Sequence, residues 1–508
     1  MTDWTAGYVA DIGYTYGYYA EMNPLRMKLA FLRAGLMPPE VGTACELGFG
    51  QGLGTNLHAA ASATHWCGTD FNPAQAAFAQ QLAAASGSGA RLLDESFAEF
   101  TARTDLPDFD FIALHGIWSW INDDNRHRIV DFVRRKLKVG GVLYTSYNTL
   151  PGWAPFAPMR HLLARHAEVM GTDGRGIVSQ VDDALAFADQ LLAQNPNYVR
   201  ANPMVPERLK QVKAQDRHYV AHEYFNRDWH PMHFATMAEW LAPAKLGFAC
   251  PAHLLDHVDN LNLTPEQQDF LKAIPDAGFR ESVRDFITNQ QFRRDYWVKG
   301  ARRLNALERT EALRAQRLAL VSHRPDVLLK VTGVLGEAQM NEEATAPILD
   351  LLADHAPRSI AEIEAAAKLP FGKLVQCLTL LCGSSHVFPV QDEAAAAAAR
   401  GRCERLNRQL MLRSRADGEV GHLASPLIGG GVPVGRFPQL FLLARSQGGE
   451  RPQDWARYAW NLLAQQNQRL LKDGHGLQTP EENLAEMGQL AQRFEQKELP
   501  ALRALQVA

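Results

Sequence analysis

Short apolar runs alternate with amphipathic stretches through the first third of the chain. The apolar runs have the length of buried strands and cover Thr43–Gly48, His65–Asp70, Phe109–His115 and Val142–Tyr147. Helical patterns such as Asp123–Leu137 lie between them. Strands that alternate with helices predict an α/β fold, with a parallel sheet covered by helices on both faces.

Helical patterns dominate the next part of the chain. Residues 155–215 contain no strand-like run. Further on, a helical pattern and a glycine precede the apolar run Phe248–Leu255, an order that could return the chain to the edge of the sheet. Residues 340–390 hold three helical stretches and a short strand, and Ser359 with Glu362 forms a capping box for the second helix. This order predicts a winged-helix-like domain.

The length and the changes of pattern predict several domains. At roughly 150 residues per domain, 508 residues suggest about three. The patterns divide the chain further, and the helical insertion is a candidate dimerisation element. The predicted regions are an α/β core (1–170), a helical insertion (171–215), a region that partly completes the sheet (216–320), a winged-helix-like domain (325–395) and a C-terminal domain (396–508).

The composition is that of a globular protein, and its charge excludes some partners. Hydrophobic residues make up 46% of the chain, charged residues 21%, and the formal net charge is −4. A chain without a basic excess lacks the electrostatic footprint of nucleic-acid or membrane binding. Residues 340–395 carry three basic against eight acidic side chains, which argues against DNA binding by the winged-helix-like domain. We expect neither nucleic acid nor a membrane as a partner.

Three features of the sequence predict a cytoplasmic location. The first residues have neither the basic nor the apolar region of a secretory signal. No uncharged apolar run approaches the ~20 residues that a membrane helix needs. The six cysteines are scattered and form no CxxC pair, as expected in a reducing compartment.

The sharpest pattern for chemistry is a glycine-rich turn between a predicted strand and a predicted helix. Gly48, Gly50 and Gly52 follow Glu46, and Asp70 ends the next strand. Glycines allow a tight turn and a close approach of backbone to ligand, in a dinucleotide site or in an S-adenosylmethionine site. Glu46 decides between the two, because a carboxylate repels a pyrophosphate but suits the cationic methionine end of S-adenosylmethionine. Asp70 is placed to hold two ribose hydroxyls.

Several longer motifs resemble one family. CELGFGQG, GTDFNP, FDFIALHGIWSWI and GGVLYTSYNTLPGW resemble class I methyltransferases. More narrowly, they are similar to a bacterial group with a methyltransferase regulatory domain, which includes the rickettsial protein-lysine methyltransferases. His222–Asn226, Asp285–Asn289 and Ala424–Pro426 resemble further elements of that group. The resemblance implies a Rossmann-like seven-stranded sheet, S-adenosylmethionine as cofactor, in-line methyl transfer and a homodimer.

The resemblance also implies which residues form the site. Side chains at the ends of the fourth and fifth strands and just after them are candidates for positioning or deprotonating the acceptor and for lining its pocket: His115, Trp118, Trp120, Tyr147, Asn148 and Trp153. The candidates for binding the cofactor are Glu46, Gly48, Gly50, Gly52, Asp70, Phe71, Ser96, Phe97, His115 and Tyr18.

Two parts of the expected cofactor site keep alternatives open. The family usually has an aspartate near the adenine where this chain has Ser96, so Asp94, Ser96 or backbone amides are the candidates for that contact. Near the N-terminus, a run of tyrosines either covers the cofactor as a lid or lies scattered on the surface. The run comprises Tyr14, Tyr16, Tyr18 and Tyr19.

Three functions remain compatible with these motifs. The first is lysine methylation of a protein substrate, such as a bacterial surface or secreted protein. The second is methylation of a small molecule, and the third is a scaffold that binds S-adenosylmethionine without turnover. We predict no metal site, because no cysteine lies near the histidines that cluster in one stretch, His218, His222, His230 and His233.

Overall fold

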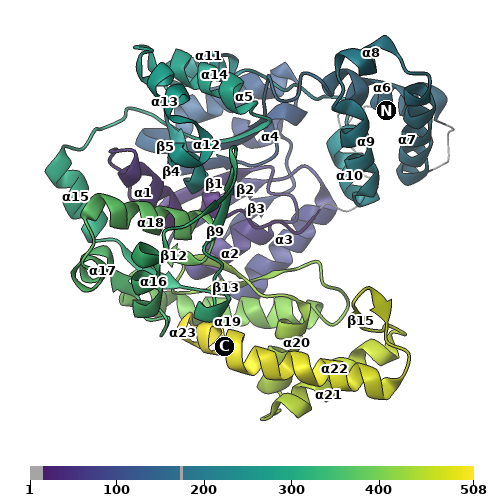
Figure 1. Cartoon of the computed structure of the whole chain (residues 1–508), viewed down its shortest axis with the longest axis vertical. Helices are drawn as coiled ribbons and strands as arrows, with labels where there is room; N and C mark the ends of the chain where they lie inside the picture. The colour runs from purple at the N-terminus through teal and green to yellow at the C-terminus, as the bar shows by residue number, and fades with distance from the viewer. Residues whose placement is uncertain (1–14, 172–175) are drawn as a thin grey trace.

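The structure, a computed structural model, describes residues 15–171 and 176–508. At its centre is a seven-stranded sheet of order β3-β2-β1-β4-β5-β7-β6 (Figure 1). The sheet confirms the predicted Rossmann-like fold. Its parallel strands are β1 (Thr43–Leu47), β2 (His65–Thr69), β3 (Arg91–Leu93), β4 (Phe109–Leu114) and β5 (Leu137–Asn148).

The other two strands come from much later in the chain. β6 (Gly247–Pro251) lies at the edge of the sheet, as the order of helix, glycine and apolar run predicts. β7 (Phe292–Val298) runs antiparallel between β5 and β6, so the five strands from the first third of the chain are parallel, as predicted, and the sheet as a whole is mixed.

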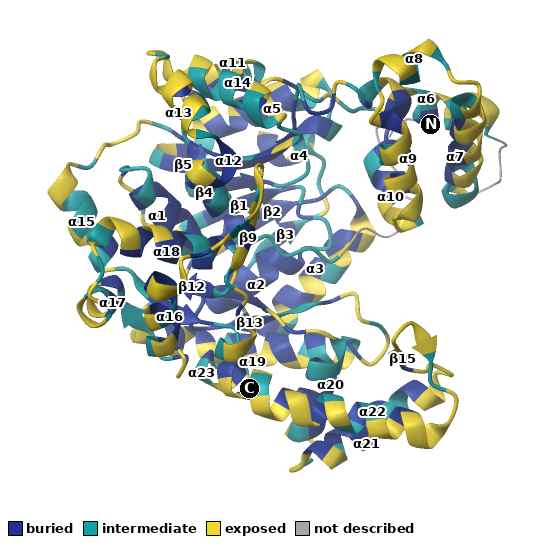
Figure 2. Cartoon of the chain, viewed as in Figure 1, coloured by how far each residue is buried: buried dark blue, intermediate teal, exposed yellow. Residues whose placement is uncertain are grey.

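Alternate side chains along each strand pack on opposite faces of the sheet. On β4, Phe111 and Ala113 join a core with Phe31 of α1 (Pro24–Arg33). Ile112 and Leu114 join a different core, built with residues of α5 (Asp123–Lys136) and α11 (Phe234–Leu241). The strands are therefore buried between helices, as Figure 2 shows. Other helices around the sheet are α2 (Leu53–Ala61), α3 (Pro73–Ser86), α4 (Phe97–Ala102) and α14 (Ala277–Thr288).

Five helices form a separate lobe with its own apolar core, which we call the helical lobe. Its core includes Trp153, Phe156, Val181 and Leu209. The lobe stands to one side of the sheet, at the upper right of Figure 1. Its helices are α6 (Ala157–Met170), α7 (Ile177–Ala193), α8 (Asn197–Ala201), α9 (Val205–Ala214) and α10 (Arg217–Tyr224).

Three helices and a small antiparallel sheet follow. The sheet has the order β11-β8-β12 and comprises β8 (Arg317–Leu320), β11 (Arg358–Ser359) and β12 (Val387–Pro389). The helices are α16 (Glu342–Leu351), α17 (Ile360–Ala367) and α18 (Phe371–Gly383). The predicted capping box of Ser359 and Glu362 is present. Leu318 on β8 lies before residue 325, where the sequence places the start of this region, and belongs to the same core as α1.

The end of the chain forms what we call the C-terminal unit. The alanine run after residue 393 is part of the long helix α19 (Glu393–Arg413), which packs on α2 and α3. Its other elements are β13 (His422–Ser425), β14 (Gly430–Pro433), α20 (Arg436–Ser446), α21 (Pro452–Gln465), β15 (Leu471–Lys472), β16 (His475–Gly476), α22 (Pro480–Arg493) and α23 (Leu499–Ala504).

Short elements connect these parts. They are α12 (Asp259–Asn262), α13 (Pro265–Lys272), α15 (Ala306–Arg314), β9 (Lys330–Gly333), β10 (Gly336–Gln339) and the 3-10 turn η2 (Trp118–Trp120). Over the part of the chain that the structure describes, no single helix is long and apolar enough to cross a membrane. Among the described helices, the pair α17 and α18 passes such a test together, and the two are bent by 117°.

Candidate functional site

The loop between β1 and α2 borders a pocket at the carboxyl end of the sheet, where open α/β sheets bind ligands. Its glycines Gly48, Gly50 and Gly52 have φ angles of 77°, 57° and 65°. A Cβ on Gly48 would lie 2.3 Å from the Cδ1 atom of Ile117, so a side chain there requires a neighbour to move. The pocket holds about 1370 Å³, including solvent at its mouth.

Two buried carboxyl groups lie beside this loop. Asp70 Oδ2 accepts a hydrogen bond from the Gly50 amide at 2.8 Å, and Asp70 Oδ1 accepts one from the Asn72 amide at 3.0 Å. Glu46 accepts a hydrogen bond from the Thr55 hydroxyl. Burial raises the pKa of Glu46 to about 7 and that of Asp70 to about 6. Among the described residues, no neighbouring cation offsets this effect of burial, so a cationic ligand would stabilise the charged form of both carboxyl groups.

His115 follows β4 and lies against Tyr19. The two rings are stacked with their centroids 3.3 Å apart, and His115 Nδ1 lies 2.7 Å from the Tyr144 hydroxyl oxygen. Burial lowers the pKa of His115 to about 3, so its imidazole is neutral near pH 7. A base as weak as His115 does not hold a proton taken from an amine. This property favours a role of His115 in orienting the acceptor over a role in deprotonating it.

The structure places two of the expected site residues, at the end of β5, away from the pocket. Tyr147 points to the opposite face from Tyr144 and donates a hydrogen bond to Asp295 Oδ2 at 2.8 Å. Successive strand residues alternate between faces, so Tyr144 and Tyr147, an odd number of positions apart, cannot share one. Asn148 is buried, and its amide donates to Ser119 Oγ. Neither Tyr147 nor Asn148 lines the pocket.

Two of the expected tryptophans are core residues instead. Trp118 is buried, and its indole nitrogen donates to Met232 Sδ at 3.3 Å. Trp153 lies in the core of the helical lobe, with its ring centroid 5.0 Å from that of Trp229. Trp120, at the other end of η2, lines the pocket. Which of the two tryptophans faces the pocket depends on how the turn η2 is oriented, and the sequence does not reveal that orientation.

The N-terminal strap, which we define as residues 15–19, covers one side of the pocket. Thr15, Gly17 and Tyr19 line the pocket, whereas Tyr18 does not. At the pocket the structure therefore places Tyr19 and not the expected Tyr18. Tyr18 points away and packs between His58 and His422, at centroid distances of 5.2 and 5.0 Å. Tyr14 lies outside the described residues.

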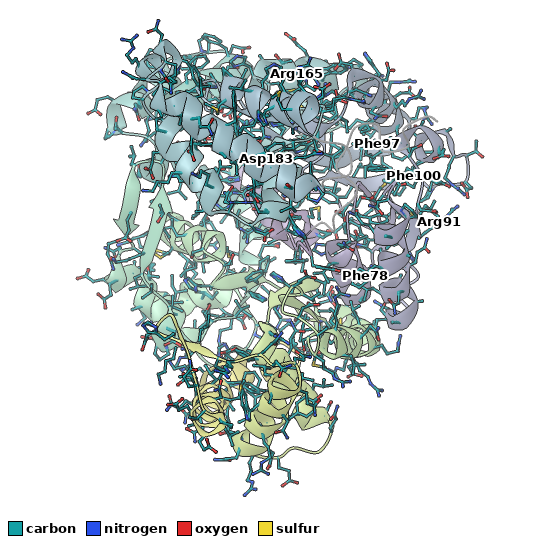
Figure 3. The ribbon with its side chains drawn as sticks, turned by 90° about the vertical axis from the view of Figure 1, so that its right-hand side faces the viewer. Phe78, Arg91, Phe97, Phe100, Arg165 and Asp183 are labelled. Atoms are coloured by element: carbon teal, nitrogen blue, oxygen red, sulfur yellow. The ribbon has the colours of Figure 1, made fainter. Side chains whose placement is uncertain are left out.

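The remaining expected cofactor residues border the pocket together. They are Glu46, Gly48, Gly50, Gly52, Asp70, Phe71, Ser96, Phe97 and His115. Ser96 also caps α4 through a reciprocal hydrogen-bond pair with Glu99. Phe97 is the first residue of α4, and in Figure 3 it lies near Phe100 of the same helix. Sequence reasoning missed Glu95, Asn122, Asn125 and Asp228, which also line the pocket.

The predicted absence of a metal site concerns four histidines. His222 is buried, whereas His218, His230 and His233 are exposed. Within residues 15–171 and 176–508, no group of three or more His, Cys, Asp or Glu side chains is placed to hold a metal ion.

Comparisons with known proteins place the chain in a family. Family models match residues 44–141 as a methyltransferase domain and residues 216–299 as a predicted methyltransferase regulatory domain. The uncharacterized protein sll1526 of Synechocystis is 38% identical over 513 residues, which cover 99% of this chain and 100% of that protein. The chain belongs to the family of methyltransferases with a regulatory domain.

More distant relatives of this methyltransferase come from Rickettsia. The uncharacterized protein RP789 of Rickettsia prowazekii is 28% identical over 282 residues, which are 54% of this chain and 49% of that protein. The structure of PKMT2 from Rickettsia typhi in complex with AdoHcy covers 97% of this chain and 100% of that chain, with a TM-score of 0.67 and 16% sequence identity. That match shows the same fold over almost the whole methyltransferase.

The pocket fits the S-adenosylmethionine that this class of enzyme uses. Glu46 would hold the ammonium group of the methionine end, and Asp70 the ribose hydroxyls. The cofactor supplies an electrophilic methyl group on a sulfonium. Its positive charge would stabilise the ionised form of both carboxyl groups, whose pKa values burial raises. Ser96 and Phe97 border the pocket beyond β3, on the side expected for adenine.

Proposed function

We propose that this methyltransferase methylates lysine side chains of a protein substrate. The acidic lining of the pocket carries the proposal. Four carboxyl groups line it, those of Glu46, Asp70, Glu95 and Asp228, and among the described lining residues there is no lysine or arginine. An ammonium group is attracted to such a site, as is the cationic methyl donor.

Two further observations support a protein as the acceptor. The fold matches that of PKMT2 of Rickettsia typhi, a rickettsial protein-lysine methyltransferase, over nearly the whole chain. The helical lobe and the C-terminal unit also flank the catalytic sheet and offer a surface larger than a small molecule needs.

The residues of this chain then act by position and charge. Glu46 and Asp70 bind the donor, and the neutral His115, held by Tyr144, orients the reacting groups between the strap and the sheet. The amine nitrogen approaches the methyl group in line with the bond that breaks. Holding two reactants in this geometry lowers the barrier by several kcal/mol, up to about 7–11 in ideal cases.

Transfer of label from tritiated S-adenosylmethionine tests this proposal. The protein is incubated with a bacterial lysate, and the products are separated into protein bands and an organic extract. We expect label in protein, recovered as methyllysine after acid hydrolysis. Gly50→Arg is the matched control, because it fills the pocket beside Asp70 and should abolish both labelling and S-adenosylhomocysteine binding. Label confined to the organic extract would show that the acceptor is a small molecule.

A further inference from the structure

The four carboxyl groups that line the pocket differ in their hydrogen bonds. Glu46 and Asp70 accept hydrogen bonds from neighbouring residues, and Glu95 Oε1 accepts one from Arg103 Nη1 at 2.5 Å. Asp228 lines the same pocket but accepts no hydrogen bond from any residue that the structure describes. Its side chain is 25% exposed, so a ligand can reach it.

Two basic side chains lie near the Asp228 carboxyl group without reaching hydrogen-bond distance. Arg227 Nη2 is 3.9 Å from Asp228 Oδ2, and His230 Nε2 is 3.6 Å from Asp228 Oδ1. The side chains of Arg227 and His230 are 63% and 49% exposed, so solvent screens both pairs. A ligand ammonium at hydrogen-bond distance would be a closer partner of Asp228 than either side chain.

A segment that follows the helical lobe carries this carboxyl group to the pocket. We call it the crossing segment and define it as residues 226–232. The His230 amide donates a hydrogen bond to the carbonyl oxygen of Ser119 in η2 at 2.8 Å. The Met232 amide donates one to the carbonyl oxygen of Asn148 in β5 at 3.1 Å. Backbone contacts therefore fix the crossing segment beside the ends of β4 and β5.

The strand order divides the pocket into two halves. Gly48, Asp70 and Ser96 follow β1, β2 and β3, which form one side of the order β3-β2-β1-β4-β5. The turn η2 follows β4, and the crossing segment is fastened to η2 and β5 on the other side. Among the described lining residues of this second half, Asp228 is the one carboxyl group. The residues expected to bind the donor line the first half, so the second half is left for an acceptor.

Trp120 supplies an aromatic wall in the second half of the pocket. Its ring centroid lies 6.3 Å from that of Trp229, the residue after Asp228. The Arg160 guanidinium lies over the rings of Trp120 and Trp229, at 6.0 and 5.0 Å. This aromatic surface therefore already accommodates one cation.

We propose that Asp228 and Trp120 form the subsite that binds the ammonium group of the acceptor. The carboxylate offers a charged hydrogen bond, and the indole offers cation–π contact and a surface for the methylene chain. This inference rests on the proposed function, because it names the place where a lysine side chain enters. Asp228 lies within residues 216–299, which match a predicted methyltransferase regulatory domain, so that region supplies a residue that binds substrate.

Binding of n-butylammonium to the protein loaded with S-adenosylhomocysteine, followed by NMR titration, tests the subsite without turnover. We expect D228N to bind this probe at least about tenfold more weakly than the native protein, the effect of losing a charged hydrogen bond. D269N is the matched control, since Asp269 is an exposed aspartate of the same matched region. Equal binding by native protein and D228N, or no binding by the native protein, would overturn the subsite. Weaker binding of S-adenosylhomocysteine by D228N would also overturn it, because Asp228 would then belong to the donor half.

The kinetics of methyl transfer to poly-L-lysine are a second readout. We expect D228N to raise the KM for poly-L-lysine by about tenfold or more with a smaller change in kcat, because the lost contact binds the acceptor. D228E, which keeps the charge, should recover part of the loss. A fall in kcat with an unchanged KM in D228N would contradict a binding role. Absence of methyllysine in the lysate would overturn lysine methylation, whereas weaker n-butylammonium binding by D228N would still support an amine subsite.

Discussion

Glu46 is buried in a position that favours its neutral form, although the contact proposed for it, with the ammonium group of the cofactor, requires the charge. Its pKa is raised to about 7, and that of Asp70 to about 6, both by burial. In the ligand-free protein near neutral pH, Glu46 is therefore only partly ionised. The ammonium of the cofactor needs the carboxylate, so binding must release a proton below this pH.

Cofactor affinity should consequently depend on pH in one direction. S-adenosylhomocysteine should bind more weakly as pH falls from about 8 to about 5.5, by up to about tenfold per unit below the pKa of Glu46. Calorimetry at several pH values measures this dependence. Glu46→Gln should weaken binding by about 1.5–3 kcal/mol and remove the part of the slope that lies above the pKa of Asp70. An unchanged slope in Glu46→Gln would assign the effect to another group.

At the scale of elements, side chains along β5 alternate between the two faces of the sheet, so Tyr144 and Tyr147 have different neighbours and different expected roles. Tyr147→Phe removes the hydrogen bond to Asp295 and should cost about 1–3 kcal/mol of unfolding free energy, with donor affinity and turnover unchanged. Tyr144→Phe removes the partner of His115 and should lower turnover. Urea unfolding and methyl-transfer rates, measured on both variants, test the assignment. Loss of turnover in Tyr147→Phe alone would reverse it.

The sequence predicts strands that consist of continuous apolar runs, and it misses β7, a strand that contains buried charged residues. β7 contains the buried Arg293 and Asp295, which no strand pattern accommodates. Arg293 reaches Asp285 on α14 at 2.6 Å and Asp295 at 2.8 Å, and Asp295 also accepts a hydrogen bond from Tyr147 of β5, so contacts made only in the folded protein allow these charges inside the sheet. The glycine loop and its acids were predictable because neighbouring residues form them. Which tyrosines of the N-terminal run face the pocket, and which of Trp118 and Trp120 does so, were not predictable, since contacts between separate parts of the fold decide both.

At the scale of the whole molecule, the C-terminal unit holds the strap from outside. Arg413 on α19 donates a hydrogen bond to the Tyr16 hydroxyl and lies 4.5 Å above its ring. Tyr18 packs on His422 of β13, and a Cβ on Gly430 would lie 2.6 Å from its hydroxyl oxygen. Tyr16 and Tyr18 are thus fixed on one side of the strap, while Thr15, Gly17 and Tyr19 face the pocket on the other.

Loosening this attachment should weaken cofactor binding from a distance. Arg413→Ala removes the contact with Tyr16 without touching the pocket, and we expect S-adenosylhomocysteine affinity to fall by about 0.5–1.5 kcal/mol. Calorimetry measures the change, and Arg415→Ala, an exposed position on the residues just after α19, is the control. Equal affinity in both variants would show that the strap holds its place without Arg413.

The C-terminal unit also contacts the residues that follow the strap. The side-chain amide of Asn23 donates to the carbonyl oxygen of Ile428 at 3.1 Å, across 405 residues of sequence. Ribosomes deliver the N-terminal part first, and domains fold as they emerge. While the protein is being synthesised, its catalytic sheet therefore precedes the contacts that fasten the strap over the pocket. The contacts that fasten the strap are complete only after β13 and β14 have been synthesised.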